Sequence, residues 1–400
     1  MNSKVLGGIL LVAGTAIGAG MLALPVSTGL AGFVPALILL VACWLFMTYT
    51  AFLMLEVNLW MPAGTNLITM ARNTLGKWGE WVSWIVYLFL LYSLTTAYVA
   101  GSGMITTTII HSLTGISIPS VMGSIPLLLL FSFFVYRGTA SVDHINRVLM
   151  IGLVIAYGLT IIFLTPNVDA SLLWNVEWNA IWIAISLVVT SFGFHIIIPS
   201  LSTYLERNVK KLLLVVSIGS LIPLLTYVAW EVVILGIVPV EGAYGLLEGY
   251  TRGLDGAQLL SVILNDSWIS MLILLFSFFA IVTSFLGVSL SLTDFLADGL
   301  KIKRTLYGKT LLYALTFLPP LIFSLADPRA FFSALEIAGA YGVVILLGLI
   351  PALMVWRGRY QLGYSSTFKT PGGKAALLLV MACALFVIVL ETLNKLRIIG

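Results

Sequence analysis

The sequence predicts an all-α membrane protein with eleven transmembrane helices, and three observations support this fold class. Only 9% of the 400 residues are charged and 60% are hydrophobic, whereas a soluble domain usually carries about 25% charged residues. The apolar residues form eleven long runs without the period-two alternation of membrane strands. Basic residues fall between these runs, mostly in every second connection. The chain is therefore predicted to be a single transmembrane domain, 1–400.

Each apolar run is close to or longer than the roughly 20 residues that cross a bilayer as a helix. The predicted spans are 5–28, 32–58, 81–110, 120–137, 147–165, 178–202, 209–237, 268–297, 307–325, 331–355 and 374–393. The first run could also be a secretory signal. Because it is long, interrupted by glycine and followed at once by another run, we interpret it as a span.

The distribution of lysine and arginine predicts the orientation. Cytoplasmic connections are enriched in these residues, and sixteen of the twenty fall on one side if the N-terminus is cytoplasmic and the C-terminus external. The sixteen are Lys4, Arg72, Lys77, Arg137, Arg147, Arg207, Lys210, Lys211, Lys301, Lys303, Arg304, Lys309, Arg357, Arg359, Lys369 and Lys374. The other four are Arg252, Arg329, Lys395 and Arg397.

Several features exclude other classes or remain open. The net charge is +4, and the basic residues are scattered singly between apolar runs, which does not favour a nucleic-acid partner. No obligate protein partner is evident. Cys43 and Cys383 lie in apolar runs, so neither a disulfide nor a thiolate metal site is expected. The external connection 238–267 carries four acidic residues among glycines and reads equally well as a lid or as a solvated loop.

Two spans contain matched interruptions. The first has a glycine-rich stretch from Gly14 to Gly20, followed by Pro25, and the sixth has Thr190 to His195, followed by Pro199. Unwound backbone at this depth is tolerated where it lines a protein cavity. There the half-helix N-termini attract a carboxylate, and freed carbonyls bind an ammonium or a small cation. A midplane site for a small amino acid is predicted; the alternative is that small residues allow close helix packing.

The positions of the interruptions indicate an internal repeat. One opens the first group of five spans (1–165) and the other opens the second (178–355), which leaves 374–393 as an additional helix. Such a five-plus-five inverted repeat carries its binding site at the repeat interface.

Three segments resemble the hydroxy and aromatic amino acid permeases, the tyrosine- and tryptophan-specific transporters of the amino acid–polyamine–organocation superfamily. The segments are GTAIGAGMLALP (14–25), SFGFHIIIPSL (191–201) and TSFLGVSLSLTDFLADGL (283–300). The resemblance implies a leucine-transporter-like fold in a bacterial inner membrane. It also implies ion-coupled symport of tyrosine or tryptophan into the cell by alternating access. The alternative is a general neutral amino acid symporter.

The resemblance further implies where a substrate binds. The substrate carboxylate would meet the amides of Gly18, Ala19 and Gly20. The amino group would meet carbonyls of Ala16, Ser191 and Phe192, with Gly193 between the flanking phenylalanines.

A sodium site of this fold also has a counterpart in the sequence. Carbonyls of Gly14, Ile17 and Ala280 would join the hydroxyls of Thr283 and Ser284. The family is considered proton-coupled, so this Thr–Ser pair could instead bond only to its own helix. No cofactor is expected; the coupling ion is predicted to be a proton, with sodium as the alternative.

His195 is the histidine predicted to lie deep in the membrane, where a titratable group suggests a functional role. It could couple transport to protons, bind substrate or simply bond within the bundle. Glu56, Glu231 and Glu336 lie nearer span ends and are predicted to be interfacial.

Aromatic residues near the breaks could contact a substrate ring. Phe192 and Phe194 flank the second interruption, and Tyr92 lies mid-span in the third span. They could box an aromatic ring by edge or offset contacts, although packing is the alternative for each.

Two other function classes are not favoured. A channel needs a continuous polar lining, which the apolar mid-span positions lack. An intramembrane enzyme needs paired acids, a metal-ligand cluster or an activated nucleophile; neither GxSxG nor HExxH occurs, and the acids are dispersed. The sequence therefore predicts a carrier and not an enzyme.

Overall fold

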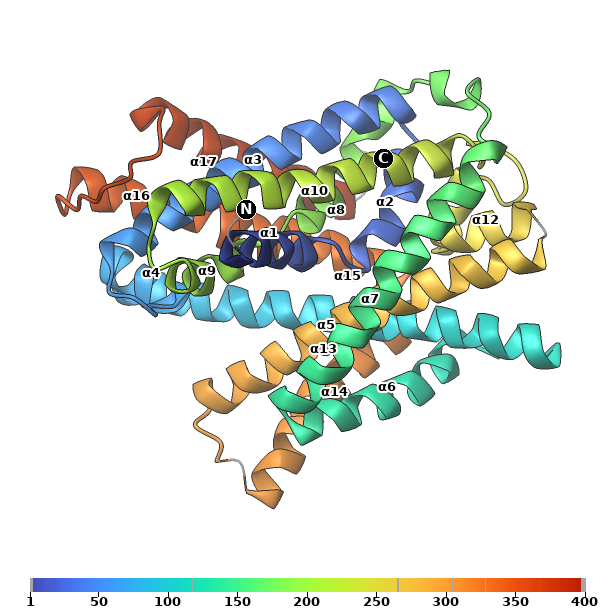
Figure 1. The fold of residues 1–400 in the computed structure, drawn as a ribbon, viewed down its shortest axis with the longest axis horizontal. Helices are drawn as coiled ribbons and strands as arrows, with labels where there is room; N and C mark the ends of the chain where they lie inside the picture. Colours follow the sequence, from blue (N-terminus) through green and yellow to red (C-terminus); the bar gives the residue numbers. More distant parts are fainter. Residues whose placement is uncertain (1–2, 117, 265, 304, 328, 397–400) are drawn as a thin grey trace.

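The computed structural model describes residues 3–116, 118–264, 266–303, 305–327 and 329–396, and these residues form helices and connections without a strand (Figure 1). The α-helices are α1 (Ser3–Ala16), α2 (Gly20–Thr28), α3 (Phe33–Trp60), α4 (Leu67–Leu75), α5 (Lys77–Thr114), α6 (Ser120–Arg137), α7 (Thr139–Leu164), α8 (Ile181–Ser191), α9 (Ile198–Tyr204), α10 (Val209–Leu235), α11 (Leu246–Arg252), α12 (Gly256–Leu264), α13 (Ser267–Gly299), α14 (Leu306–Ala326), α15 (Ala330–Ile337), α16 (Ile350–Tyr360) and α17 (Gly373–Lys395). Short 3-10 turns are η1 (Thr165–Asn167), η2 (Leu172–Trp174), η3 (Trp178–Ala180) and η4 (His195–Ile197), and the π-helix η5 (Ala338–Leu349) joins α15 to α16.

Every predicted span corresponds to one or more helices in the structure. Within the described residues, nine helical stretches are long and apolar enough to cross a membrane, and the bent pair α1–α2 makes a tenth. The predicted fourth span corresponds to the shorter apolar helix α6. The sequence missed α4, α11 and α12, which lie in connections and do not cross the bundle.

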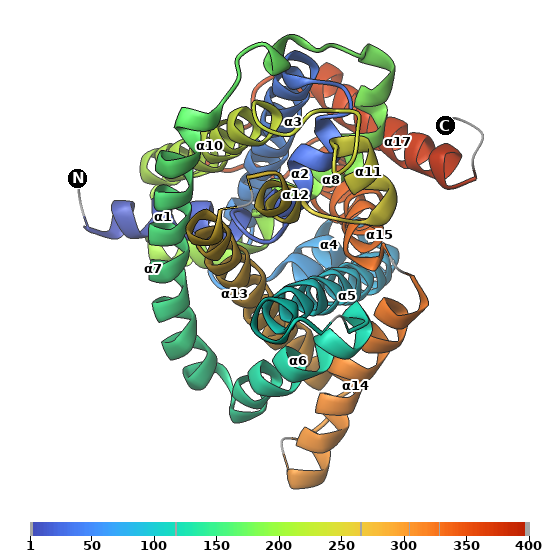
Figure 2. The ribbon, with the colours of Figure 1, turned by 90° about the vertical axis from the view of Figure 1, so that its right-hand side faces the viewer.

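The bundle has two distinguishable ends along its long axis (Figure 1). At one end lie α4 and the connections α9–α10 and α16–α17, which carry many of the basic residues; we call this the basic end. At the opposite end lie α11, α12 and the α7–α8 connection, as Figure 2 also shows. Arg304 and Arg397, which entered the orientation argument, lie outside the described residues.

A tight turn at Gly32 joins α2 to α3 at the opposite end. Its φ of +87° lies in the region that favours glycine. A Cβ there would lie 1.9 Å from the carbonyl oxygen of Asn175. The adjacent Ala31 carbonyl accepts a hydrogen bond from the Glu177 amide at 2.9 Å. The connection between the two predicted repeats is therefore anchored to the end of α2.

Two of the predicted interfacial glutamates are buried and form ion pairs. Glu56 (1% exposed) is bound by the Arg359 guanidinium through both carboxylate oxygens and by the Thr370 amide at 2.7 Å. Glu336 (5% exposed) accepts from Lys395 at 2.7 Å. Glu231 is fully buried without such a partner. Each of these carboxylates is enclosed by neighbouring helices and is not solvated at the bundle surface; their depth in the membrane stays a prediction.

The segment 238–267 is packed and not a solvated loop. Its helices α11 and α12 lie against α2, and Leu246 and Leu259 are buried. Asp255, just before α12, is 2% exposed, and this burial raises the pKa of its carboxyl to about 6. The segment covers α2 at the opposite end of the bundle.

Candidate functional site

The first span is interrupted as predicted. Helix α1 ends at Ala16 and α2 begins at Gly20, with a bend of 57° between their axes. The first amides of a helix have no partner within it, and that of Ala19 donates instead to the Ser284 hydroxyl of α13 at 3.0 Å. The turn therefore exposes polar backbone groups in the middle of the bundle.

The sixth span is interrupted at the predicted place as well. Helix α8 ends at Ser191, and the turn η4 begins at His195. The intervening phenylalanines, Phe192 and Phe194, are fully buried. Phe192 packs edge-on against Tyr227 with ring centroids 5.3 Å apart, and Phe194 packs against the His195 ring at 5.1 Å. This break is held in place by large side chains.

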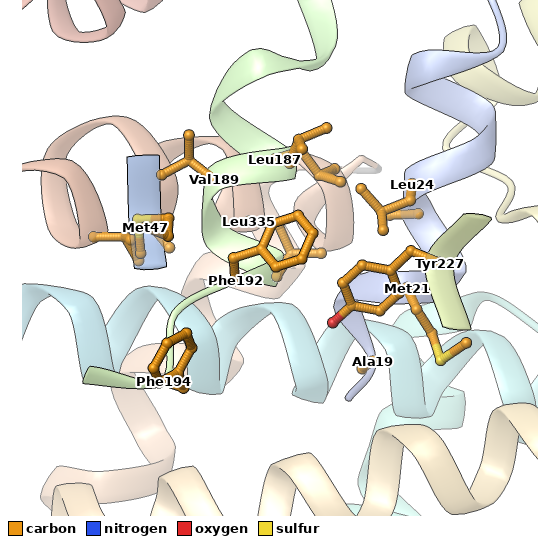
Figure 3. Packing of buried hydrophobic residues seen from close by; sticks show 14 of the residues in the cluster. Ala19, Met21, Leu24, Met47, Leu187, Val189, Phe192, Phe194, Tyr227 and Leu335 are labelled. Carbon is orange, nitrogen blue, oxygen red and sulfur yellow. The ribbon is translucent and has the colours of Figure 1, made fainter. Parts of the chain in front are cut away.

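Tyr227 of α10 joins the two breaks. Its hydroxyl lies 2.8 Å from the carbonyl oxygen of Ala16 and 2.8 Å from that of Ser191, and it can donate its single proton to either. Figure 3 shows the Tyr227 ring beside Phe192, with its hydroxyl directed between the two interrupted helices. The last carbonyls of α1 and α8 thus converge on one donor, and the two breaks face each other.

A cavity of about 450 Å³ lies at the breaks. It is lined by Gly14, Thr15, Ala16, Ile17, Gly18, Gly20, Tyr87, Leu90, Leu91, Leu94, Tyr98, Asn146, Met150, Thr190, Ser191, Gly193, Ile196, Ile197, Ser200, Thr283, Ser284, Gly287, Val288, Ser291, Leu335, Val343 and Leu347. We call it the central cavity. It combines backbone polar groups with a mostly apolar wall, as small-molecule sites usually do.

The central cavity extends toward the basic end. Tyr87, Ile196 and Ser200 also line a second cavity of about 560 Å³, whose wall includes the start of α4. On the other side, all residues of α2 from Met21 to Thr28 are buried. The cavity is therefore closed toward the opposite end and continuous with space at the basic end.

Most of the predicted site residues come together around this cavity. Those that line it are Gly14, Ala16, Ile17, Gly18, Gly20, Ser191, Gly193, Thr283 and Ser284. Ala19 is buried, with its amide bonded to Ser284. The space beside Gly18 is tight, because a Cβ there would lie 2.5 Å from the Ser284 Oγ.

The predicted aromatic box is not formed in this structure. The Tyr92 hydroxyl turns to α14 and donates to the Leu315 carbonyl at 2.9 Å. Phe192 and Phe194 point into the packed core and do not line the cavity. An α-helix places residues six apart on different faces, so Tyr98 reaches the cavity while Tyr92 does not.

His195 does not reach the central cavity either. It is fully buried, and its Nε2 lies 2.8 Å from the Thr50 hydroxyl of α3. The ring is therefore held within the bundle through one nitrogen, while its Nδ1 has no hydrogen-bond partner among the described residues. Its role in proton coupling or substrate binding stays a prediction.

The predicted cation ligands are close together, but their hydroxyls have partners in their own helix. Thr283 Oγ1 donates to the Phe279 carbonyl at 2.7 Å, and Ser284 Oγ donates to the Ala280 carbonyl at 2.9 Å. This back-bonding is usual for such residues within helices. Among the described residues, no group of three His, Cys, Asp or Glu side chains could hold a metal ion.

Comparison with known proteins matches the chain over nearly its whole length to one family. A family model described as the tryptophan/tyrosine permease family matches residues 1–391. The chain belongs to this family. The tryptophan-specific transport protein of Haemophilus influenzae is 32% identical over 387 residues, covering 93% of this chain and 91% of that protein. The tyrosine-specific transport system 1 of the same organism is 33% identical over 393 residues, covering 96% of both chains. The glutamine transporter 2 of Aliivibrio fischeri is more distant, at 29% over 360 residues and 89% of both chains.

Family membership confirms several predictions. As a tryptophan/tyrosine permease family member with nine or ten helices able to cross a membrane among its described residues, the chain is an integral membrane protein. Its relatives are bacterial transport proteins, which indicates the inner membrane and a transporter, not an enzyme.

Sequence reasoning missed several residues of the site. Tyr98 and Asn146 line the cavity, and Tyr227 bridges the breaks. A helical stripe of Tyr87, Leu91, Leu94 and Tyr98 marks the cavity face of α5. Because the faces toward lipid and toward protein are both apolar in a membrane helix, this stripe does not stand out in the sequence.

Proposed function

We propose that the chain is a secondary active transporter that carries tryptophan or tyrosine into the cell by ion-coupled symport. The observation that carries this proposal is the convergence of the Ala16 and Ser191 carbonyls on one hydroxyl, beside the first turn of α2. A free amino acid presents an ammonium and a carboxylate. The carbonyls suit the ammonium, and the amides of Gly18 and Gly20 at the N-terminus of α2 suit the carboxylate.

The rest of the central cavity suits an aromatic side chain. Leu90, Leu94 and Val343 supply apolar surface, and Tyr87 and Tyr98 supply rings that can pack at an edge or offset. The names of relatives also favour this class, since two of them are called tryptophan- and tyrosine-specific.

Eleven crossings, arranged as two inverted groups of five and an additional helix, remain our proposal for the architecture. The basic end would be cytoplasmic, because lysine and arginine gather there. The central cavity would then face inward in this structure and outward in an alternate state. Alternating access between the two states would move the substrate.

For the coupling ion we propose a proton, with sodium as the alternative. The hydroxyls of Thr283 and Ser284 donate to carbonyls of their own helix, which is the usual arrangement without a bound cation and leaves oxygen lone pairs for sodium as the alternative. Proton coupling needs a titratable group that responds to the position of the broken helices.

The test is uptake of radiolabelled tryptophan, tyrosine and leucine into proteoliposomes, with proton and sodium gradients imposed separately. We expect tryptophan or tyrosine to accumulate under a proton gradient and to compete far better than leucine. Equal uptake of all three would contradict aromatic specificity, and accumulation under the sodium gradient alone would contradict proton coupling.

A general neutral amino acid transporter is the second candidate, favoured by the relative that is named a glutamine transporter. Adding glutamine and alanine as competitors to the same assay separates the two candidates. Strong competition by either would favour the general carrier.

A further inference from the structure

Glu231 is a carboxyl group buried in the membrane-spanning helix α10 without a cationic partner. Its side chain is fully buried. Oε1 lies 2.7 Å from the Thr28 hydroxyl of α2, which can donate its single proton either to Oε1 or to the Leu24 carbonyl, also at 2.7 Å. Oε2 has no hydrogen-bond partner among the described residues. The similarly buried Glu56 is bound by an arginine and an amide. Glu231 lacks this compensation.

The helices around Glu231 do not supply a counter-charge. Helices α2 and α8 carry no titratable side chain. The charged and titratable groups of the other elements packed on α10 or α2, and of α10 itself, are Lys4 (paired with Glu206), Cys43, Tyr49, Glu56 (paired with Arg359), Asp143 (paired with Arg147), His144, Tyr157, Lys210, Lys211, Tyr227, Glu248 (paired with Arg252), Tyr250 and Asp255. The cations of this set belong to the basic end or already bind a carboxylate at the surface.

An uncompensated carboxylate is costly inside a membrane protein, and such residues commonly mark proton pathways. The neutral carboxylic acid avoids that cost and can donate from the oxygen that lacks a partner. A conformational change that brings water or a hydrogen-bond donor to Oε2 would stabilise the carboxylate, so that the proton can leave. The surroundings of the Glu231 carboxyl are therefore expected to decide whether it is protonated.

The position of Glu231 ties it to the moving parts. Its bond to Thr28 fastens α2, the second half of the broken first span, to α10. Four residues earlier on α10, the Tyr227 hydroxyl lies 2.8 Å from each of the two carbonyls that end α1 and α8. Residues four apart lie on the same helix face. A shift of α2 would change the surroundings of both side chains together.

Glu231 also lies between two spaces. Leu235, one helical turn later, and Gly29, next to Thr28, both line a cavity of about 150 Å³ at the opposite end of the bundle. On its other side, Tyr227 and the breaks separate it from the central cavity, which continues to the basic end. A proton could thus reach Glu231 from one side and leave on the other.

We propose that Glu231 is the proton-binding site that couples transport to the pH gradient, with Thr28 linking its protonation to the position of α2. The inference rests on the proposed proton symport. In each cycle the carboxylate takes one proton from water at the opposite end, and α2 packs against the neutral acid. After the substrate leaves toward the basic end, the proton passes to water there and the carboxylate is restored.

The experiment compares wild type with Glu231→Gln in proteoliposomes. Glutamine has a similar shape and can accept from Thr28, but it cannot exchange a proton. At an imposed gradient of one pH unit, symport with one proton allows about tenfold accumulation of tryptophan or tyrosine. We expect the variant to show none, while it still exchanges internal for external substrate without a gradient.

The controls separate the two proposals. His195→Gln removes another buried titratable group and should accumulate substrate as the wild type does. Accumulation of about tenfold by Glu231→Gln would overturn the role of Glu231. If the wild type itself ignores the pH gradient, proton symport is wrong, and the role proposed for Glu231 falls with it.

A second variant, which keeps the carboxyl group, decides the test if Glu231→Gln misfolds. If Glu231→Gln neither folds nor exchanges substrate, Glu231→Asp decides, because it retains a titratable group at the same position. Restored accumulation, with a shifted pH optimum, supports the proposal. Exchange without accumulation by Glu231→Asp contradicts it.

Discussion

The two helix breaks use similar sequence signals but are built differently. At the first break, Ile17 and Gly18 line the central cavity, and the backbone contacts the hydroxyls of Ser284 and Tyr227. At the second break, Phe192 and Phe194 are buried in the core on either side of Gly193 (Figure 3). The first break exposes its backbone to the cavity, whereas the second is anchored to the bundle by large rings.

The difference indicates a division of roles. A stretch of small residues leaves space for a ligand and can be displaced at low cost. Buried aromatic rings resist displacement, because removing a buried phenylalanine side chain costs about 3 to 5 kcal/mol. We therefore expect the first break to control binding and movement and the second to provide a fixed wall.

The largest expected effect comes from filling the first break. Gly18→Leu should reduce uptake at least about a hundredfold, equivalent to about 3 kcal/mol, since even its Cβ would lie 2.5 Å from Ser284 Oγ. Gly20→Leu should act similarly, with its Cβ 3.2 Å from Ser191 Oγ. Radiolabelled uptake, normalised to inserted protein, provides the measurement.

A smaller substitution at the second break provides a comparison. In Gly193→Ala, the nearest atom to the new Cβ is the Thr190 carbonyl oxygen at 3.1 Å, and the next lies 3.7 Å away. This variant should retain most of its uptake. Near-normal uptake by both leucine variants would show that the substrate carboxylate does not bind at the first break.

The second prediction concerns the contact that joins the two breaks. Tyr227→Phe leaves the Ala16 and Ser191 carbonyls without their shared donor, at a cost of about 1 to 3 kcal/mol. The unfolding temperature should fall without substrate, and saturating tryptophan or tyrosine should recover part of the loss, because the ammonium can replace the hydroxyl. If the unfolding temperature falls equally with and without bound substrate, the substrate ammonium lies elsewhere.

The third prediction separates the roles of two neighbouring hydroxyls. Ser284→Ala removes the acceptor of the Ala19 amide. It should weaken substrate affinity about fivefold, equivalent to about 1 kcal/mol, in the presence or absence of sodium. Thr283→Val removes a hydroxyl that bonds within its own helix, so it should matter only if sodium binds there. A sodium requirement that rises in Thr283→Val would favour the sodium site over proton coupling.

The smallest effect is expected at the fixed wall. His195→Gln can keep the hydrogen bond to Thr50. Uptake driven by a pH gradient should stay within about twofold of wild type, since a tolerated buried-polar replacement costs under about 0.5 kcal/mol. If His195→Gln loses pH-driven accumulation but still exchanges substrate, His195 takes part in proton coupling.

The sequence predicted the helices and both breaks because their signals are local. Long apolar runs and the glycines between Gly14 and Gly20 act on the chain that contains them. The sides of each helix could not be assigned in the same way. Tyr92 and Tyr98 are both mid-span tyrosines, and only the packing of α5 against its neighbours decides which one reaches the cavity.

Buried polar groups were the other class that the sequence could not resolve. Glu231 lies six residues before the end of its predicted span, 209–237, where a carboxylate could equally well meet water. Its burial depends on α2, which comes from the other half of the chain. The distinction between Glu56 and Glu231 likewise depends on Arg359, which is far from Glu56 in sequence.

The burial of α2 has a consequence for how the gene can vary. All side chains from Met21 to Thr28 are enclosed, whereas α1 exposes Leu6, Leu10 and Leu11. Many substitutions in α1 fall on its exposed face, which tolerates any apolar residue. A substitution in α2 instead contacts packed neighbours on every side. Saturation mutagenesis selected for growth on the transported amino acid should therefore recover many alleles in the first half of this span and few in the second.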